Sequence, residues 1–414
     1  MKIVIVGGGT AGTAFARKLR FYNKDVDITL VDKTNNNQYS PCSLPYFIEG
    51  KISSVDVYNS YKEDNINFLK QHFPIKRKNN SLVLFDGSIE KSLGYDVLVL
   101  ATGSKPIIPK IKGLKDFFLL KTKQDAIKLK KITGNTTILG GGYIGLELAF
   151  ALAKNSDVTI VESKDSLLAN YLDKDMSSKV YDYLKKKGIN IILNKKITDI
   201  KQIKTKNLVI STGFKPDLDI LKKLDLKYRP NEKLMIDKNT YLIGDMAKTK
   251  NLITNKYEYC MLGSIAQKQG EFLAKNILSD NQKKYGGFIP NSVSKIGDLV
   301  IGSVGLTKNI ANTIFENIVV SKITTTNKYM TCGGEEYILK IICNSKGLIL
   351  GCQIIGKEEV AGRLNMVSGF IRSKLTIYDL VKVDTCYNPC VANIKDPLIE
   401  AAKIAIKKIE IKYG

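Results

Sequence analysis

The stretch that decides the fold of the first part of the chain is Lys2-Ile3-Val4-Ile5-Val6-Gly7-Gly8-Gly9-Thr10-Ala11-Gly12. Its apolar residues predict a buried strand, and the glycines that follow have the spacing G-x-G-x-x-G. We expect a helix over 13–22 and a second strand over 28–31, which ends at Asp32, about 20 residues after the last glycine. Glycines permit close backbone approach to a pyrophosphate, the helix N-terminus attracts its charge, and the carboxylate accepts hydrogen bonds from a ribose. The stretch therefore predicts a dinucleotide site.

The same order of elements returns in the middle of the chain. A strand over 136–139 leads into Gly140-Gly141-Gly142-Tyr143-Ile144-Gly145, followed by an expected helix over 146–154 and a strand over 158–161 that ends at Glu162. A carboxylate at the ribose position disfavours the extra phosphate of NADP, so we expect NADH here. Lys164 nearby weakens this preference.

The repetition continues beyond the glycine loops. A strand ending in Ala101-Thr102-Gly103 follows the first unit, and one ending in Ser211-Thr212-Gly213 follows the second. Two such units in one chain predict two dinucleotides, one tightly held and one exchangeable. The predicted fold class is α/β, with two Rossmann-like dinucleotide-binding domains.

The last third has a different pattern and completes the fold prediction. From about Pro290 we expect strands over 299–301, 318–323, 337–343 and 348–355, then helices over 360–374 and 396–404. Strands followed by helices predict an α+β domain. Earlier in the chain, residues 67–78, which include the only histidine, His72, are predicted to be surface helix and loop.

Composition limits the classes of function. The chain has 414 residues, a mass of 46.0 kDa and a formal net charge of +24. Its lysines are scattered and accompany no nucleic-acid motif, so we expect a solvated basic surface, or steering of an anionic small molecule, and no nucleic-acid partner. No apolar run is long enough to cross a membrane, and the N-terminus is a strand, not a signal peptide. We therefore expect a soluble cytoplasmic protein with no membrane partner.

The cysteines predict individual thiols. The seven cysteines show neither paired zinc-ligand spacing nor a Cys-x-x-Cys pair, which argues against a disulfide framework and favours reactive or buried thiols. A single histidine excludes most histidine-ligated metal sites, and no metal is expected.

These motifs together carry a family resemblance over essentially the whole chain. The two glycine loops, Ala-Thr-Gly and Tyr241-Leu242-Ile243-Gly244-Asp245 resemble the FAD-dependent pyridine nucleotide-disulfide oxidoreductases. The resemblance implies FAD in the first unit and NAD(P)H in the second. It divides the chain into an FAD domain (1–111 and 239–289), an NAD(P)H domain (112–238) and a dimerisation domain (290–414). The implied FAD contacts are Gly7, Gly9, Thr10, Ala11, Gly12, Asp32, Lys33, Ser40, Ala101, Thr102, Gly103, Gly244, Asp245 and Ala266. The implied NAD(P)H contacts are Gly140, Gly142, Tyr143, Ile144, Gly145, Glu162 and Gly213.

The segment Ser40-Pro41-Cys42-Ser43-Leu44-Pro45-Tyr46 indicates the branch of the family. The two-cysteine members carry a second cysteine five residues on, where this chain has Phe47, and a histidine near the C-terminus, which it lacks. The segment is similar to the single-cysteine branch of coenzyme A-disulfide reductases, NADH oxidases, NADH peroxidases and sulfur reductases. Oxidases and peroxidases place a histidine in the first glycine loop, where this chain has Thr10. Coenzyme A disulfide or polysulfide is therefore the favoured acceptor.

The C-terminal segment extends the resemblance to a homodimer. Tyr387-Asn388-Pro389-Cys390 and Asp396-Pro397-Leu398 are similar to a family pattern that implies a tyrosine reaching the partner subunit's active site. The alternative is an ordinary half-buried aromatic residue. Cys386 and Cys390 would then lie near Cys42 of the partner, either as resolving thiols or as ordinary buried cysteines.

Catalysis at Cys42 needs a thiolate. Ser40 is expected to cap a helix that begins with Pro41 and Cys42, which would lower the thiol pKa modestly, since Pro45 is expected to limit that helix to a short turn. The thiolate would attack a disulfide or polysulfide sulfur. An NADH oxidase or peroxidase, and an electron-transfer reductase for a protein partner, are the alternatives. Candidate cations for an anionic acceptor, with a solvated helix face as the alternative, are Arg17, Lys18 and Arg20.

Overall fold

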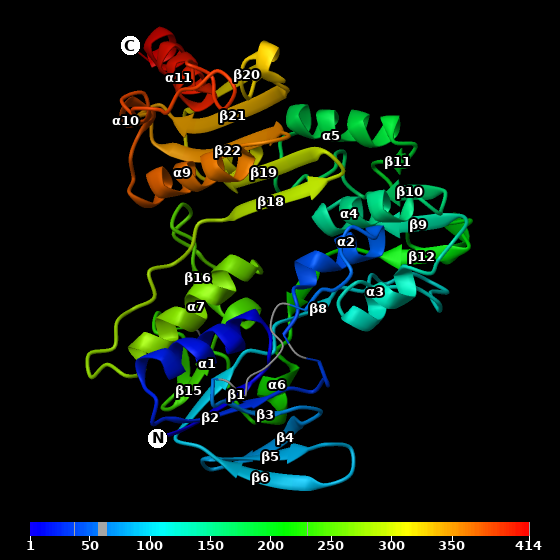
Figure 1. Ribbon diagram of the computed structural model, residues 1–414, viewed down its shortest axis with the longest axis vertical. Coiled ribbons are helices and arrows are strands. Elements are labelled where there is room, and N and C mark those ends of the chain that lie inside the picture. The colour runs from blue at the N-terminus through cyan, green and yellow to red at the C-terminus, as the bar shows by residue number, and fades with distance from the viewer. Residues whose placement is uncertain (37, 57–63, 230, 414) are drawn as a thin grey trace.

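The computed structural model describes residues 1–36, 38–56, 64–229 and 231–413. Figure 1 shows three bodies, each built around its own main sheet, with the N-terminal strands at the bottom, the middle of the chain on the right and the C-terminal sheet at the top. This arrangement confirms the predicted α/β fold with a C-terminal α+β part. In the described part of the chain, no helix is both long and apolar enough to cross a membrane.

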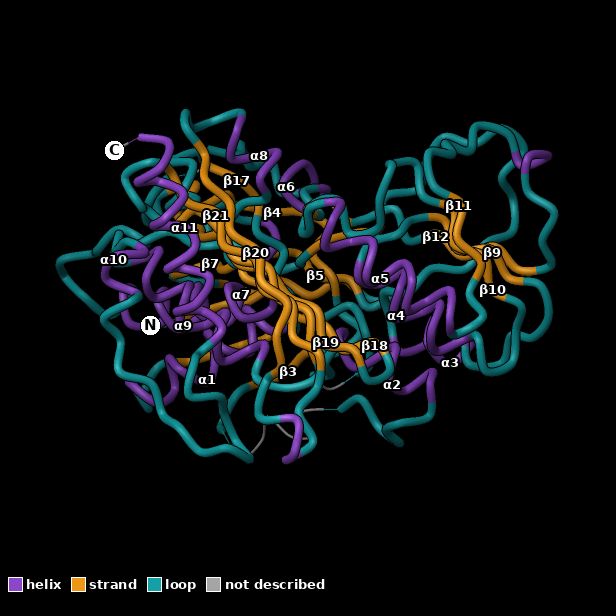
Figure 2. The backbone as a smooth tube through the Cα atoms, turned by 90° about the horizontal axis from the view of Figure 1, so that it is seen from above, coloured by secondary structure: helices purple, strands orange, loops and turns teal. Residues whose placement is uncertain are grey.

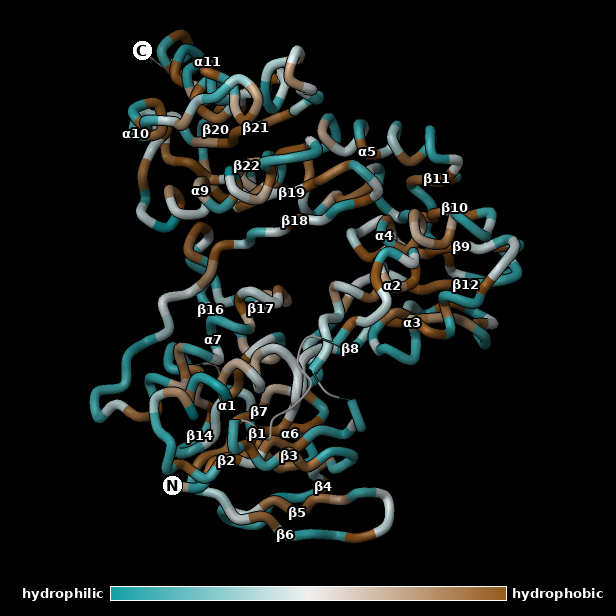
Figure 3. The backbone as a smooth tube through the Cα atoms, viewed as in Figure 1, coloured by the Kyte–Doolittle hydropathy of each residue, from teal (hydrophilic) through white to brown (hydrophobic). Residues whose placement is uncertain are grey.

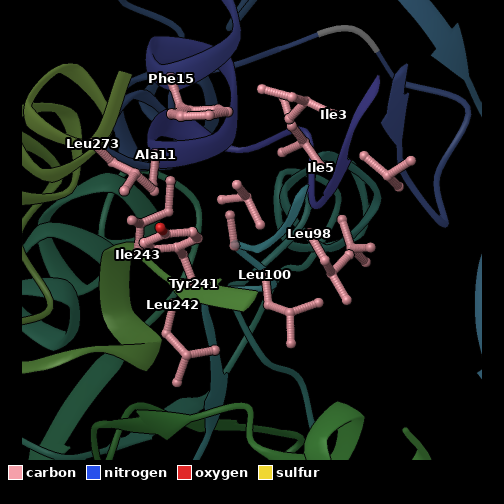
Figure 4. Close-up of a cluster of buried hydrophobic side chains, with 14 of the residues drawn as sticks. Ile3, Ile5, Ala11, Phe15, Leu98, Leu100, Tyr241, Leu242, Ile243 and Leu273 are labelled. Atoms are coloured by element: carbon pink, nitrogen blue, oxygen red, sulfur yellow. The ribbon is translucent and has the colours of Figure 1, made fainter. Parts of the chain in front are cut away.

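The first unit is a six-stranded sheet in the order β14-β15-β7-β1-β2-β3. The central strands β1 (Lys2–Val6), β2 (Asp27–Val31) and β7 (Val97–Leu100) are parallel, and their buried apolar residues form one core with α1 (Thr10–Tyr22) and α7 (Gly263–Asn276). Figure 4 shows Phe15 and Leu273 from these helices in the same cluster as Ile3, Ile5 and Leu98 from the strands. The other strands are β3 (Asn67–Leu69), β14 (Met235–Asp237) and β15 (Thr240–Leu242).

The prediction of surface helix and loop for residues 67–78 is wrong. This segment forms β3, which pairs in parallel with β2, and β4 (Phe73–Lys78), which pairs with β5 (Ser81–Phe85). β6 (Glu90–Gly94) completes a three-stranded antiparallel sheet. The segment is mostly polar, so its pairing with distant strands, rather than its own pattern, decided its conformation.

The second unit is a parallel sheet in the order β11-β10-β9-β12, set apart on the right in Figure 2. Its helix α4 (Tyr143–Leu152) begins directly after Gly142, just as α1 begins after Gly9. Both helices therefore start three residues earlier than expected, inside the glycine motif. The other elements are β9 (Thr136–Leu139), β10 (Val158–Val161), β11 (Asn190–Ile192), β12 (Asn207–Ile210), α3 (Lys123–Leu129), α5 (Lys174–Lys186) and the 3-10 turn η2 (Ile200–Gln202).

The C-terminal body is an antiparallel five-stranded sheet in the order β18-β19-β22-β21-β20, with α9 (Val360–Arg372) and α11 (Pro397–Tyr413) packed on it. In Figure 3 the strands carry brown hydrophobic stretches, while α5 and the outer loops are mostly teal. The strands are β18 (Asn291–Ile296), β19 (Leu299–Gly305), β20 (Ile318–Thr326), β21 (Glu336–Asn344) and β22 (Ile349–Gly356), and the short helices are α8 (Lys308–Asn312), η4 (Met330–Cys332) and α10 (Ile377–Leu380).

Short elements join the three bodies. α2 (Leu44–Glu49) leaves the first unit and packs on α4 of the second, and the antiparallel pair β8 (Ser104–Pro106) and β13 (Phe214–Pro216) connects the same two units. Lys340 on β21 lies buried between Asp173 and Asp175 at the start of α5, with Nζ–O distances of 2.7 and 2.6 Å. The remaining elements are η1 (Pro41–Ser43), α6 (Asp219–Lys223), η3 (Gly244–Met246), β16 (Lys248–Lys250) and β17 (Tyr257–Tyr259).

Candidate functional site

The first glycine loop has room for a ligand and no room for side chains behind it. Gly7 has φ +114°, and a Cβ there would lie 2.3 Å from the carbonyl oxygen of Ala101. A Cβ on Gly12 would lie 2.0 Å from the carbonyl oxygen of Gly7, whereas one on Gly9 would meet no described atom within 4 Å. No side chain caps the N-terminus of α1 within the described residues. The loop therefore offers an open backbone surface at a positive helix end, which fits a pyrophosphate.

The acid after β2 lies beside the first glycine loop. Asp32 accepts hydrogen bonds from the backbone N–H of Gly8 at 2.7 Å and of Thr34 at 2.8 Å. It is thereby tied to the glycine loop. Lys33 beside it is exposed.

The predicted contacts from the distant parts of the chain come together near the start of α1. Gly244 in η3 donates its N–H to Gln269 of α7 at 2.7 Å, and Asp245 accepts a hydrogen bond from Ser104 at 2.6 Å. A Cβ on Gly244 would lie 3.0 Å from that of Ala11 and 3.8 Å from that of Ala266. Thr102 bonds Met246 of the same turn. These residues fit the first unit as an FAD site.

The second glycine loop repeats this geometry. Gly140 has φ +112°, a Cβ on Gly145 would lie 2.0 Å from the carbonyl oxygen of Gly140, and one on Gly142 would meet no described atom within 4 Å. Glu162 accepts from the N–H of Gly141 at 2.6 Å and from that of Lys164 at 2.8 Å. The second loop thus has the same fit to a dinucleotide.

The second loop opens into a cavity of about 1460 Å³. Tyr143 and Ile144 line it, as do Gly213 and the lysines at 164, 195 and 196. The Tyr143 ring packs on Tyr171, with ring centroids 4.7 Å apart, and burial raises the pKa of its hydroxyl. This open cavity, with a carboxylate and lysines at one end, fits an exchangeable nicotinamide dinucleotide.

Cys42 lies in the turn η1 immediately before α2. The chain turns there because Pro41 fits the first helical position, and Pro45 is tolerated near the start of α2, so the helix runs on to Glu49 instead of stopping. The side chain of Ser40 makes no capping hydrogen bond in the described structure, contrary to expectation. The Cys42 residue is exposed to solvent and belongs to no disulfide.

The electrostatic surroundings of Cys42 oppose a thiolate in the chain by itself. Desolvation raises the pKa of the Cys42 thiol, and the charges of Glu147 and Asp245 raise it further, while Lys121 lowers it. The residue as a whole is exposed, while the protein around it still desolvates the thiol group. The expectation of a pKa lowered by the helix is therefore wrong, because burial and two carboxylates outweigh a short, uncapped helix.

Glu147 is a functional candidate that the sequence reasoning missed. It lies on α4, and its carboxylate accepts a hydrogen bond from the Ser294 hydroxyl of β18 at 2.6 Å. Burial raises its carboxyl pKa to about 7. Tyr46 of α2 also reaches β18, donating to the carbonyl of Lys295 at 3.1 Å. A titratable acid thus lies near Cys42. In the sequence, the only feature that pointed to Glu147 was its place in the Leu-Glu pair that ends the second glycine motif.

Lys121 is a second missed residue. Its ammonium group lies 3.4 Å from Ser104 Oγ, which bonds Asp245, and its charge acts on Cys42. Burial lowers the pKa of Lys121. Nothing in its local sequence distinguishes it from the other lysines, since only tertiary packing brings it to the thiol.

Tyr387 lies in the C-terminal body. Its hydroxyl is 3.4 Å from that of Tyr329, and 48% of the residue is exposed. Cys390 forms a disulfide with Cys332, while Cys386 is free and exposed. The prediction that the cysteines form no disulfide is therefore wrong for this pair, which is 58 residues apart in sequence and has no local motif.

The candidate cations on α1 are occupied by structural contacts. Arg17 pairs with Asp64 at 3.0 Å, and Arg20 donates to the carbonyl groups of Val26 and Asn65. Lys18 lies over the ring of Phe21 at 4.9 Å. These contacts favour the alternative interpretation of a structural and solvated helix face.

Comparison with known proteins identifies the family. The pyridine nucleotide-disulphide oxidoreductase model matches residues 1–270, and the dimerisation domain of the same family matches residues 292–397. The chain belongs to this family. Its members use FAD and NAD(P)H, in agreement with the two dinucleotide sites, and the chain is an oxidoreductase.

Relatives that carry different enzyme names match almost the whole of this chain. The chain is 36% identical over 450 residues to an NADH oxidase of Methanocaldococcus jannaschii, with 100% of both chains covered. It is 27% identical to an NAD(P)H coenzyme A polysulfide/persulfide reductase of Pyrococcus horikoshii, covering 97% of this chain and 98% of that one. The crystal structure of reduced Bacillus anthracis CoADR-RHD superposes with a TM-score of 0.94 at 25% identity, covering 99% of this chain and 80% of that one.

Proposed function

We propose that this oxidoreductase reduces a low-molecular-weight disulfide or polysulfide, with coenzyme A disulfide or polysulfide as the acceptor class, and that Cys42 is the residue that reacts with it. The observation that carries the proposal is the position of Cys42. The thiol is free and solvent-exposed, and it interacts electrostatically with Asp245 of the first unit and Glu147 of the second. A free thiol whose charged neighbours come from both dinucleotide units can receive electrons from one side and an acceptor from solvent.

The chain's own residues would divide the work as follows. The first glycine loop, Asp32 and Asp245 hold FAD, and the second loop with Glu162 holds NADH, or NADPH with lower preference. When bound, FAD would accept a hydride from the nicotinamide and would supply the two electrons that finally break the bond between Cys42 and the acceptor sulfur, which releases the second thiol and restores Cys42. Cys42 attacks one sulfur of the acceptor, forming a mixed disulfide or persulfide and releasing the other half as a thiolate.

Protons must also reach the leaving thiolate, and Glu147 is in a position to supply them. Its pKa of about 7 leaves it partly protonated at neutral pH, the condition that general acid–base catalysis favours. Protonation of Glu147 also removes a negative charge that raises the pKa of Cys42. We further propose a homodimer through residues 290–414, in which Tyr387 enters the site of the partner subunit.

A second candidate function is that of an NADH oxidase. The relative that is 36% identical over its whole length carries that name. Against it, the first glycine loop has Thr10 and not an imidazole that could donate protons to oxygen or peroxide. NADH consumption measured in parallel with coenzyme A disulfide, polysulfide, peroxide and oxygen separates the two candidates. Turnover that is highest with oxygen would replace the proposed function by the second.

Substitution of Cys42 tests the proposed mechanism directly. The Cys42→Ser variant should bind FAD normally and still accept a hydride from NADH, yet lose acceptor reduction by about a thousandfold or more, as loss of a nucleophile does. Flavin absorbance in a stopped-flow experiment measures the first half-reaction, and steady-state NADH consumption measures the second. Cys260→Ser, at a buried cysteine, is the matched control. Full turnover with disulfide acceptors in Cys42→Ser would contradict the mechanism.

A further inference from the structure

The disulfide beside Tyr387 lies outside the catalytic chemistry described so far. Cys332 belongs to η4, in the loop between β20 and β21, and Cys390 belongs to the turn that follows Tyr387. Cys390 is exposed, and its N–H is bonded to the side chain of Asn388 at 3.0 Å. The bond therefore joins two surface segments and contributes nothing to a buried core.

Few other contacts hold these two segments together. Tyr329 donates its N–H to the carbonyl of Pro389 at 3.2 Å, and the hydroxyl groups of Tyr329 and Tyr387 are 3.4 Å apart. Residues 384–396, all of them described, place no side chain in the hydrophobic core of the C-terminal body. The nearest buried residues on either side of the segment are Leu380 and Pro397. Asn393 of the same segment also donates to the carbonyl and hydroxyl oxygens of Thr326 on β20. The disulfide is the covalent constraint on the position of Tyr387 within a segment anchored at its two ends.

We propose that Cys332 and Cys390 are a second redox-active pair, which exchanges with low-molecular-weight thiols and disulfides and thereby fixes or releases Tyr387. The inference deepens the proposed function, on which it rests for the class of thiol. Its chemistry differs from that of Cys42, because the pair holds its two electrons in its own bond and needs no nucleotide.

The exchange is balanced without a cofactor. The thiolate of a small thiol attacks the exposed sulfur of Cys390, the bond to Cys332 breaks, and the electron pair leaves on Cys332, which takes a proton from solvent. A second thiolate then attacks the mixed disulfide on Cys390. Two small thiols are oxidised to one disulfide, and the protein disulfide is reduced to two thiols. The reverse reaction closes the bond when the small disulfide accumulates.

The surface around the pair fits this role. Met330 and Val391, next to the two cysteines, are 69% and 63% exposed. Cys386, adjacent to Tyr387, is a free and exposed thiol. Opening of the disulfide would loosen an apolar surface that carries Tyr387. Acceptor turnover would therefore depend on the ratio of oxidised to reduced small thiol, the quantity that the proposed reaction changes.

Thiol labelling of the FAD-loaded enzyme tests the pair without NADH. The protein is equilibrated with mixtures of reduced and oxidised coenzyme A, labelled with a maleimide and mapped by mass spectrometry. Cys332 and Cys390 should gain label together as the reduced fraction rises, and Cys386→Ser should leave this titration unchanged. The proposal is overturned if Cys332 and Cys390 remain unlabelled, or fully labelled, at every ratio of reduced to oxidised coenzyme A.

A tryptophan reporter tests the release of Tyr387. The chain contains no tryptophan, so Tyr387→Trp introduces the single one. Its fluorescence anisotropy should fall on reduction by coenzyme A, and should be low at every ratio when Cys390→Ser is added. Unchanged anisotropy across the titration would overturn the link to Tyr387. If Cys332 and Cys390 titrate but the enzyme does not reduce disulfides, the exchange site stands and the proposed function is refuted. If the enzyme reduces disulfides but the two cysteines do not titrate, the proposed function stands and the exchange site is refuted.

Discussion

The two dinucleotide units are built on one plan. In each, the last glycine of the loop would place a Cβ 2.0 Å from the carbonyl oxygen of the first glycine, and the first has a φ above +110°. In each, the acid after the second strand accepts a hydrogen bond from the middle of the loop. Loop, helix start and acid are therefore equivalent, so their difference in role must come from elsewhere.

The difference lies in what packs on the helix after each loop. α1 lies against α7, and a Cβ on Gly270 of α7 would come within 2.5 Å of the Ala11 carbonyl and 3.2 Å of the Ala14 Cβ. In α4 the position equivalent to Ala14 is Glu147, which bonds Ser294, and the six-residue helix that follows Cys42 packs there. In the first unit the small residue Ala14 lets the long helix α7 pack closely on α1. In the second unit the equivalent residue is the buried acid Glu147, whose charge acts on the Cys42 thiol.

The comparison indicates how a duplicated unit can serve the two roles that we propose for it. The first unit is enclosed by α1, α7 and η3, as a tightly held cofactor requires. The second opens into the large cavity and contacts the Cys42 helix, as an exchangeable reductant requires. Substitutions at equivalent or neighbouring positions of the two units should therefore affect only the nucleotide of the unit in which they lie.

The largest effect is expected from the glycines that a Cβ would clash with. Gly12→Ala should purify with little bound FAD, while Gly145→Ala should retain FAD and lose affinity for NADH. In both, overpacking of about 1–3 kcal/mol corresponds to roughly five- to 150-fold weaker binding. Flavin content and NADH titration measure the two effects.

Gly9→Ala and Gly142→Ala are the matched controls, since a Cβ there meets no described atom within 4 Å. They should leave the thermal midpoint unchanged and weaken only nucleotide binding. If Gly145→Ala loses FAD as completely as Gly12→Ala, the division of roles between the units is wrong.

The next effect concerns the acid that only the second unit has. Glu147 has a folded pKa of about 7, above its ordinary value of 4.5, so the native state keeps a proton that the unfolded chain has released. Stability should therefore be full below pH 4.5 and fall as the pH rises to about 7, by about 3 kcal/mol at most. Glu147→Gln should remove this slope in urea unfolding. An identical slope in wild type and variant would show that Glu147 does not titrate in this range.

A smaller effect is expected on the choice of nucleotide. Glu162→Gln removes the charge opposite the site of the NADP phosphate, so the ratio of NADPH to NADH efficiency should rise about tenfold. Asp32→Asn, the equivalent change in the first unit, should leave that ratio unchanged while weakening FAD retention. Steady-state kinetics with both nucleotides measure the ratio, and a response to Asp32→Asn would mean that the two acids do not serve separate ligands.

The smallest effect is expected from the cation near Cys42. Lys121→Met should raise the pKa of the Cys42 thiol only slightly, because desolvation is the largest influence on it and stays in place. Lys123→Met, which removes a lysine paired with Asp56, is the control. The pH dependence of alkylation of Cys42 measures the shift. A fall in the pKa would mean that Lys121 does not act on the thiol.

Prediction from sequence succeeded where a pattern is local. The strands β1, β9 and β10, the positions of the glycines and the acids at 32 and 162 all follow from spacing within one unit. It failed where distant segments decide the outcome. Residues 67–78 pair with strands far away, and Cys332 and Cys390 bond across 58 residues. The expected helix start at Pro41 is a 3-10 turn, and Pro45 does not end the helical stretch because it lies in the first turn of α2, which begins at Leu44.

The sequence by itself determined that this chain has two dinucleotide sites, a candidate thiol at Cys42 and a separate C-terminal domain, because glycine spacing and apolar strands act over a few residues. The tertiary structure alone decided the charges around Cys42. Glu147, Lys121 and Asp245 come from three separate parts of the chain, and the electrostatic effect of each depends on distance and burial, neither of which a sequence states. The tertiary structure also decided that Cys390 bonds with Cys332, and that α7 packs on α1 while α2 packs on α4.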